Sequence, residues 1–406
     1  MSHVLVINTG SSSLKYQLVD SESGDWSAKG LVERIGEEGS SLVHRLPDGE
    51  GEQITTDLPD HGAALELVLR AFTDVGPGLD DLVAVGHRVV HGGPDYREPV
   101  VIDAQVEDAI EELVPLAPLH NPAALIGIRE LRRLMPQVPH VAVFDTAFHA
   151  TMPPEAYTYA IPSELARQHR IRKYGFHGTS YRYVTRKAAQ LLDLPVDEVN
   201  LIICHLGNGA SMAAVRGGRG IDTTMGLTPL QGLVMGTRSG DIDPAVVFHL
   251  VREAGLTLDE VDALLNKNSG LKGLAGDQDM REVRALAAAG DDAAGLALDV
   301  YAYRIRSYIG AYLAELPDLH ALVFTAGIGE NDSALRAQVC DPLGHLGIGI
   351  DAELNTAPGG GARAIDAGET PIRVLVVPTN EEAEIARQSA LAVSALTSPV
   401  NGLTSR

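Results

Sequence analysis

The chain has 406 residues, of which 45% are hydrophobic, so it is long enough to fold into two globular domains. Its 54 acidic residues outnumber its 32 lysines and arginines, giving a formal net charge of −22. This charge disfavours nucleic acid and anionic membranes as partners, so any bound anion needs a local cluster of cations. Two cysteines without a C-x-x-C spacing, and no leader or membrane-spanning apolar run, predict a cytoplasmic protein without disulfides.

Two segments almost half a chain apart follow the same pattern. Residues 4–20 and residues 201–217 each contain an apolar strand, a turn of small residues and a second strand. Gly10 in the first turn matches Gly207 in the second. Turns of Gly, Ser and Asn leave backbone N–H groups uncovered, so a polyanion can approach closely. One such hairpin is common in α/β proteins, but the pair predicts a duplicated clamp on a chain of phosphates.

Apolar strands alternate with amphipathic stretches along the chain, which is typical of α/β proteins. A Met-Pro-Pro sequence places a domain boundary near residue 150, and the last helix is expected to cross back to the first half. We therefore predict an N-terminal domain of residues 1–149 plus 383–398 and a C-terminal domain of residues 150–382.

Several helices can be predicted from local signals. Capping residues are expected at three starts, which are Asn121 before Pro122, Thr257 with Glu260, and Thr379 with Glu382. Apolar residues at helical spacing predict one long helix over residues 291–316. Residues 322–332 predict a strand, a glycine turn and a helix start at Asn331 and Asp332. Such a turn either seats an adenosine or its phosphates or is an ordinary βα turn.

Four short segments place charged residues among small or apolar ones. These residues are Arg88, Asp145, His177 and Arg238. Because arginines in such surroundings are partly buried, Arg88 and Arg238 indicate a bound anion, with ordinary Asp–Arg ion pairs as the alternative. His177 taken alone favours a buried structural histidine. The sequence GxxxxGK[ST] does not occur, which excludes a P-loop.

These segments resemble, in order and spacing, those of the acetate kinases. The matching sequences are NTGSSSLK, GHRVVHGG, FDTAFH, YGFHGTS, HLGNGAS, MGTRSGDIDP, DMR, GIGEN and PTNEE. Acetate kinases belong to the superfamily of sugar kinases, Hsp70 and actin, and the resemblance extends from residue 4 to the final helix. It implies a two-domain α/β protein with a duplicated actin-like or ribonuclease H-like fold and the nucleotide in the interdomain cleft.

The resemblance also implies an activity. This is the reversible, direct in-line transfer of phosphate between ATP and acetate, which gives acetyl phosphate and ADP. It implies Mg²⁺ as the cofactor, with Mn²⁺ as an alternative ion, and a homodimer. Two other functions stay open. One is a kinase for propionate or another short-chain acid, and the more distant one is a non-metabolic ATPase of the actin or Hsp70 type.

Each site residue receives a role from the resemblance. Asn8 and Glu381 would hold magnesium. Arg88 would bind the substrate carboxylate, Asp145 would be the catalytic acidic residue, and His177 and Arg238 would stabilise the transition state. The methyl group would be surrounded by Val90, Leu119, Phe176 and Pro229. ATP would be bound by Ser11, Ser13, Lys15, His205, Leu206, Gly207, Asn208, Gly209, Asp279, Met280, Arg281, Gly327, Ile328, Gly329, Glu330 and Asn331.

Acetate is already a carboxylate at neutral pH, so the nucleophile needs no general base. We therefore expect Asp145 to orient an arginine or a magnesium-bound water. Two positions depart from the family pattern, because Thr9 stands where Ala is common and Tyr181 stands where His is usual. The role of that His does not transfer to Tyr181. Glu381 also suits the first turn of a helix through the helix dipole alone.

Overall fold

The structure is a computed structural model that describes residues 2–368 and 370–397. Residue 398, the expected end of the final helix, lies outside the described residues. Within the described ranges, no helix combines the length and the apolar composition that crossing a bilayer requires.

The chain forms two compact units, residues 1–147 with 380–406 and residues 148–379. The expected domain limits lie a few residues later in the chain than these divisions. The structure therefore assigns Glu381 and Glu382 to the first unit, although the predicted limits placed them in the C-terminal domain.

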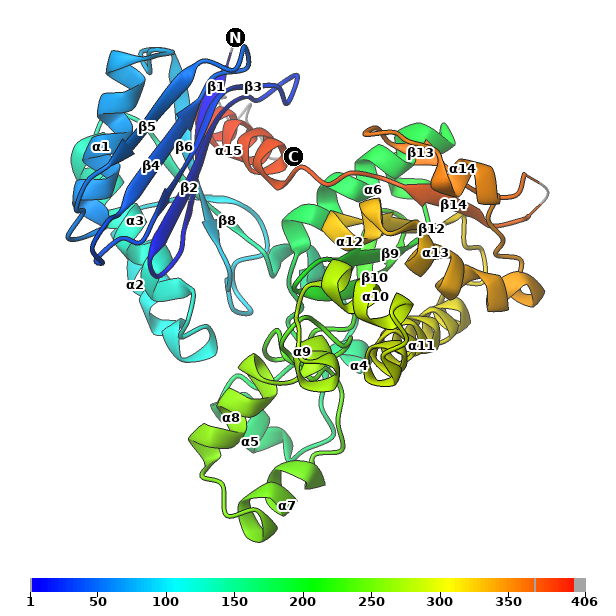
Figure 1. The fold of residues 1–406 in the computed structure, drawn as a ribbon. Coiled ribbons are helices and arrows are strands. Elements are labelled where there is room, and N and C mark those ends of the chain that lie inside the picture. Colours follow the sequence, from blue (N-terminus) through cyan, green and yellow to red (C-terminus); the bar gives the residue numbers. More distant parts are fainter. Residues whose placement is uncertain (1, 369, 398–406) are drawn as a thin grey trace, which may run out of the picture. The chain divides into compact units, whose positions relative to one another are not determined.

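The first unit contains an eight-stranded sheet in the order β5-β4-β3-β2-β1-β6-β8-β7 (Figure 1). The central strands β1, β6 and β8 are parallel, so their carboxyl ends lie at one edge. The strands are β1 (His3–Thr9), β2 (Ser13–Asp20), β3 (Trp26–Glu33), β4 (Ser41–Arg45), β5 (Gly51–Thr55), β6 (Leu82–Val89), β7 (Val100–Val101) and β8 (His140–Phe144).

Helices cover both faces of this sheet. They are α1 (His61–Asp74), α2 (Ala104–Glu112), α3 (Asn121–Leu134) and α15 (Glu381–Thr397). Val85 of β6 belongs to the apolar core under α1, whereas the next residue, Gly86, faces α15. A Cβ on Gly86 would lie 2.6 Å from Oγ of Ser389 and 2.8 Å from Cγ2 of Ile385. The glycine therefore allows α15 to approach the sheet closely.

The second unit contains a six-stranded sheet in the order β11-β10-β9-β12-β14-β13 (Figure 1). The strands are β9 (Leu201–Leu206), β10 (Ala210–Arg216), β11 (Arg219–Thr223), β12 (Ala321–Thr325), β13 (Arg363–Ala364) and β14 (Arg373–Val376). The order and strand directions repeat those of β3-β2-β1-β6-β8-β7 in the first unit. This repeat confirms the predicted duplicated α/β fold and both predicted hairpins.

The helices of the second unit vary widely in length. They are α4 (Pro154–Tyr157), α5 (Ser163–Gln168), α6 (Gly178–Leu192), α7 (Ala245–Glu253), α8 (Leu258–Lys267), α9 (Gly270–Ala275), α10 (Met280–Ala288), α11 (Asp292–Glu315), α12 (Ala326–Asn331), α13 (Ser333–Cys340) and α14 (Ala352–Thr356). Helix α6 packs on the sheet through Tyr181, Val184 and Ala188. The long helix predicted over residues 291–316 is confirmed as α11.

Two of the predicted helix starts differ in their capping residue. Thr257 and Glu260 form the expected capping box. At α3, His120 occupies the cap position, and the Asn121 side chain instead bonds both backbone groups of His91. The proline after Asn121 is in the first turn, as predicted. The Asn121 side chain therefore bonds the buried backbone of His91 and does not cap its own helix.

The start of α15 also departs from the prediction. The side-chain oxygen of Asn380 accepts from the backbone N–H of Ala383 at 2.9 Å, so Asn380 is the capping residue. Oγ1 of Thr379 lies 2.8 Å from Oγ of Ser180 instead. Asparagine is at least as good a capping residue as threonine, which explains why Asn380 and not Thr379 caps α15.

The segment after β12 is more helical than expected. Residues 326–331 form α12, where the sequence predicted a glycine turn. Ala326 has a φ of 64° and so makes the reversal that a glycine was expected to make. Asp332 accepts from the backbone N–H of Leu335 and caps the following helix, α13.

Candidate active site

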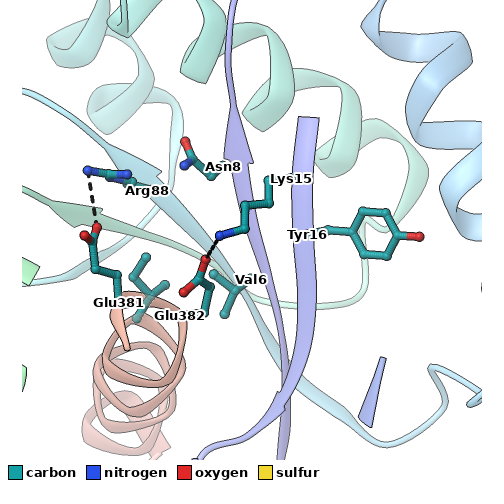
Figure 2. Close-up of a pocket in the computed structure, with 8 residues that line it drawn as sticks. Val6, Asn8, Lys15, Tyr16, Arg88, Glu381 and Glu382 are labelled. Atoms are coloured by element: carbon teal, nitrogen blue, oxygen red, sulfur yellow. Dashed lines mark hydrogen bonds and ion pairs between the residues drawn. The ribbon is translucent and has the colours of Figure 1, made fainter. Parts of the chain in front are cut away.

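The carboxyl ends of β1 and β6 and the start of α15 bring polar side chains together in the first unit. Asn8 lies on β1, Arg88 on β6 and Glu381 on α15. Figure 2 shows Arg88 facing Glu381, and Lys15 of β2 facing Glu382. These five side chains line one small pocket. Segments from both ends of the chain therefore form this cluster.

Arg88 contacts two carboxylates. Its Nε and Nη2 donate to Oδ2 of Asp145 at 3.1 and 2.8 Å, and Nη2 lies 3.3 Å from Oε2 of Glu381. Asp145 directly follows β8, the parallel neighbour of β6, and its side chain is 2% exposed. Burial lowers the pKa of Arg88, but Asp145 and Glu381 raise it above its ordinary value. Nη1 makes no hydrogen bond to a described residue, so it is the group that can bind an anion.

Asn8 and Glu381 are the residues expected to hold magnesium. Oε2 of Glu381 is buried and has no hydrogen-bond partner in the described part of the chain. Burial raises the pKa of Glu381, and Arg88 opposes this shift. Amide and carboxylate oxygens are ligands that Mg²⁺ prefers, and phosphates and water often complete its coordination. The two residues therefore fit a magnesium ion shared with a nucleotide.

Clusters of acidic, histidine and cysteine side chains are the usual metal sites that a protein forms by itself. Among residues 2–368 and 370–397, no group of three or more His, Cys, Asp or Glu side chains is placed to hold a metal.

Lys15, expected to bind ATP, forms an ion pair in the structure. Its Nζ lies 2.5 Å from Oε1 of Glu382. Burial raises the pKa of Glu382, but Lys15 lowers it below its usual range. The sequence did not indicate this pair, because 367 residues separate its members. Ser11 and Ser13, also assigned to ATP, lie in the first hairpin turn and at the start of β2.

The second hairpin turn, residues 207–209, lies beside two side chains expected to stabilise the transition state. The backbone N–H of Gly207 donates to the carbonyl of Gly209 at 3.1 Å. A Cβ on Gly209 would lie 3.6 Å from Nη1 of Arg238 and 3.7 Å from Nε2 of His177. A glycine therefore leaves space next to both groups.

Arg238 has no carboxylate partner among the described residues. Its Nη1 donates to the carbonyl of Pro229 at 3.3 Å and lies 3.6 Å from Sδ of Met235. Burial lowers its pKa, but an arginine stays charged at neutral pH. A partly buried guanidinium that contacts only neutral groups is suited to bind an anion. An ordinary Asp–Arg ion pair, which was the alternative to a bound anion, therefore occurs at Arg88 but not at Arg238 in the described residues.

His177 precedes α6 in a strained backbone conformation. Its φ is 57°, which few residues other than glycine adopt. Its ring stacks on that of His205 with centroids 4.1 Å apart, and its Nδ1 lies 2.8 Å from Oγ of Ser211. Nδ1 of His205 lies 2.8 Å from Oγ of Ser180. Such strain is found preferentially at functional sites, where the surroundings impose it.

A pocket of about 720 Å³ lies in the second unit, within the size range of small-molecule sites. The residues expected at the nucleotide that line it are Gly207, Asn208, Asp279, Met280, Arg281, Gly327, Ile328 and Asn331. Five further lining residues were not expected, and these are Gln278, Arg284, Asp332, Ser333 and Ala334. Four of the five adjoin an expected residue, directly or through another of them, so they extend the expected segments.

Of the residues assigned to ATP, five in the second unit do not line this pocket. They are His205, Leu206, Gly209, Gly329 and Glu330. The carbonyls of Gly329 and Glu330 accept from Nη1 of Arg336 at 2.8 and 3.0 Å. Arg336 is 1% exposed, and its other bonds go to Asn355. No sequence pattern indicates this buried arginine, which donates hydrogen bonds to the carbonyls of α12.

The four residues expected around the methyl group belong to different units. Val90 and Leu119 are in the first unit, and Phe176 and Pro229 are in the second. Phe176 is buried, whereas Leu119 is 66% exposed. Pro229 lies beside Arg238 through its carbonyl. The pocket that all four would form stays a prediction.

Comparisons with known proteins show the family of this chain. Residues 3–387 match the sequence profile of the acetokinase family. The chain is 59% identical to acetate kinase from Leifsonia xyli subsp. xyli, over 97% of this chain and all of the relative. It is similar to the crystal structure of Porphyromonas gingivalis acetate kinase, with a TM-score of 0.93 and 42% identity over 97% of this chain and 100% of that chain. It is also similar to the crystal structure of a propionate kinase from Francisella tularensis subsp. tularensis. The TM-score is 0.90 and the identity is 41%, over 96% of this chain and 99% of that chain. The chain belongs to the acetokinase family.

Proposed function

We propose that this chain transfers the γ-phosphoryl group of ATP directly to acetate, forming acetyl phosphate and ADP, and that it catalyses the reverse reaction. Family membership supports this reaction. The observation that most strongly supports the transfer site is the position of Arg238 and His177 beside the second hairpin turn, with no carboxylate pairing Arg238 among the described residues. A non-metabolic ATPase would not need an arginine held in this way.

Charge is the main requirement of this reaction. Both the attacking acetate and the γ-phosphate are anions, so the protein must supply positive charge and hold the two in line. We assign Arg88 to the acetate carboxylate, and Arg238 and His177 to the phosphoryl oxygens. Asn8 and Glu381 would hold Mg²⁺, which when bound supplies further positive charge at the phosphates.

Three further properties belong to this proposal. ATP occupies the pocket lined by α10, α12 and α13, with its phosphates toward residues 207–209. The protein is cytoplasmic, and it is a homodimer. Sedimentation of the purified chain tests the last point, because a monomer would contradict it.

Trapping the product tests the function. With ATP, Mg²⁺ and hydroxylamine, we expect acetyl hydroxamate to form in proportion to ADP. Propionate should also react, because one methylene in an apolar site changes the free energy by only about 1 to 3 kcal/mol. ADP release without an acyl hydroxamate would support an ATPase, and a preference for butyrate would contradict the acetate assignment.

Asp145→Asn should lower kcat by about tenfold to a hundredfold, because an amide cannot hold Arg88 through charge-assisted bonds. It should also raise the Mg²⁺ concentration needed for activity. The control is Asp60→Asn, because asparagine caps α1 as well as aspartate does. The wild-type chemical step should show no solvent deuterium isotope effect of proton-transfer size. A large effect would mean that Asp145 moves a proton.

Val90→Ala tests the acyl pocket. The substitution removes two methyl groups from the expected wall, so kcat/KM for propionate should rise relative to acetate. The wild-type preference for acetate, about tenfold to two hundredfold, should narrow or reverse. Val100→Ala on β7 makes the same change elsewhere and should leave the ratio unaltered. An unchanged ratio in a stable Val90→Ala enzyme would remove this residue from the pocket.

A further inference from the structure

Gly236 lies in the loop that carries Arg238, next to a wall of the nucleotide pocket. It is buried, and it does not itself line the pocket. Its backbone N–H donates to the backbone carbonyl of Asn208 at 3.0 Å. Asn208 belongs to the second hairpin turn and lines the pocket. Gly236 therefore joins the loop of Arg238 to the turn that is expected to bind phosphates.

The space in which a side chain of residue 236 would begin is already occupied. A Cβ on Gly236 would lie 2.0 Å from Oδ1 of Asn208 and 3.2 Å from the backbone carbonyl oxygen of Gln278, which also lines the pocket. Non-bonded heavy atoms prefer separations of about 3.5 to 4.0 Å. The φ of Gly236 is not positive, so alanine suits this backbone conformation. The contact with Asn208 is therefore the main obstacle to a side chain here.

The loop of Gly236 is held more firmly than the side chain of Asn208. The three backbone carbonyls of residues 235–237 accept hydrogen bonds of 2.9 to 3.0 Å from backbone N–H groups of residues 269–272, at the start of α9. Moving the loop would break these bonds, which is costly for buried backbone groups. The Asn208 side chain is exposed, and no hydrogen bond within the described residues holds it. A side chain at residue 236 would therefore displace the Asn208 amide.

We propose that Gly236 is a positioning residue for the nucleotide, because its lack of a side chain allows the Asn208 amide to lie where it can bind ATP. The amide nitrogen of an asparagine carries two donors, which suit phosphate oxygens. Gly236 itself does not contact ATP and acts through Asn208. The inference rests on the proposed function in one respect, which is that ATP occupies this pocket.

The test is the dissociation constant of ATP, measured by calorimetry on the full chain with Mg²⁺ and without acetate. Gly236→Ala should weaken ATP binding about tenfold, which is the effect of losing one hydrogen bond. Asn208→Ala should weaken it by about the same factor. The double variant should bind ATP no more weakly than Asn208→Ala, because the methyl group at residue 236 then meets no amide.

Kinetics provide a second readout. Gly236→Ala should raise KM for ATP about tenfold with little change in kcat at saturating ATP, whereas loss of the Arg238 side chain should mainly lower kcat. The control is Gly310→Ala on α11, where a Cβ would have no atom within 4 Å. This variant adds the same methyl group outside the pocket lining, so it should leave the dissociation constant and KM for ATP unchanged.

Three results would overturn the proposal. They are an unchanged ATP affinity in folded Gly236→Ala, an unchanged affinity in Asn208→Ala, and a double variant that binds ATP clearly more weakly than Asn208→Ala. The second result needs no change at Gly236, so a failure of Gly236→Ala to fold leaves the test intact. A wild-type chain that binds ATP but forms no acyl hydroxamate would contradict the proposed function and not this inference.

Discussion

Arg238→Ala is expected to lower kcat by about a hundredfold or more, with a much smaller change in KM for ATP. Arg238 contacts only neutral groups of the described chain, beside the turn expected to bind phosphates. Its charge is therefore in place before the reaction and can stabilise charge that develops in the transition state. Removing one such group costs on the order of a hundredfold to a thousandfold.

The fold should tolerate this substitution. No carboxylate among the described residues pairs with Arg238, so its loss leaves no buried anion unpaired. Thermal unfolding of Arg238→Ala should match that of Arg219→Ala, in which an exposed arginine on β11 is removed. A near-normal kcat in folded Arg238→Ala would exclude this arginine from the mechanism.

Arg88→Ala is expected to abolish most activity and also to lower stability. Asp145 is almost fully buried, Oε2 of Glu381 is buried as well, and both lose their cation. Breaking a buried ion pair by removing one partner costs about 3 to 5 kcal/mol, because an unpaired charge remains. The Arg88→Ala and Arg238→Ala proteins should therefore differ in stability, although both should lose most of their activity.

A second substitution separates these two effects of Arg88→Ala. Adding Asp145→Asn removes one of the unpaired charges, so the double variant should regain part of the lost stability while activity stays low. Denaturant unfolding of the full chain measures the stability, and the hydroxamate assay measures the activity. An Arg88→Ala protein as stable as the wild type would contradict the ion-pair description of this cluster.

The duplicated fold could be predicted because its signals are local. Both hairpins have strands with continuous apolar residues and turns of small residues, and α11 has apolar residues at helical spacing. The capping residues were harder to predict, because more than one group can make the same hydrogen bond. The side chain of Asn121 bonds the His91 backbone, and Asn380 caps α15 in place of Thr379. Local preferences are weak when a buried backbone group offers another hydrogen bond.

The candidate site could be proposed from the sequence where its residues stand in recognisable short segments. Arg88, His177 and Arg238 stand in such segments, and their roles stay predictions. The contacts of Lys15 with Glu382, and of Tyr181 with Ser211, are long-range pairs of common residue types, and no spacing in the sequence indicates them. Arg336 is an arginine on a helix, a pattern that ordinarily predicts an exposed side chain, yet it is buried against α12.

The central claim is that the γ-phosphoryl group passes directly from ATP to acetate. The most direct measurement is the stereochemical course of the reaction, using ATP whose γ-phosphorus is made chiral with oxygen isotopes. A single in-line displacement inverts the configuration at phosphorus, so acetyl phosphate should form with inversion. Retention would require two displacements through a phosphorylated side chain, and it would contradict the account in which Arg88, Arg238 and His177 position two anions for one transfer.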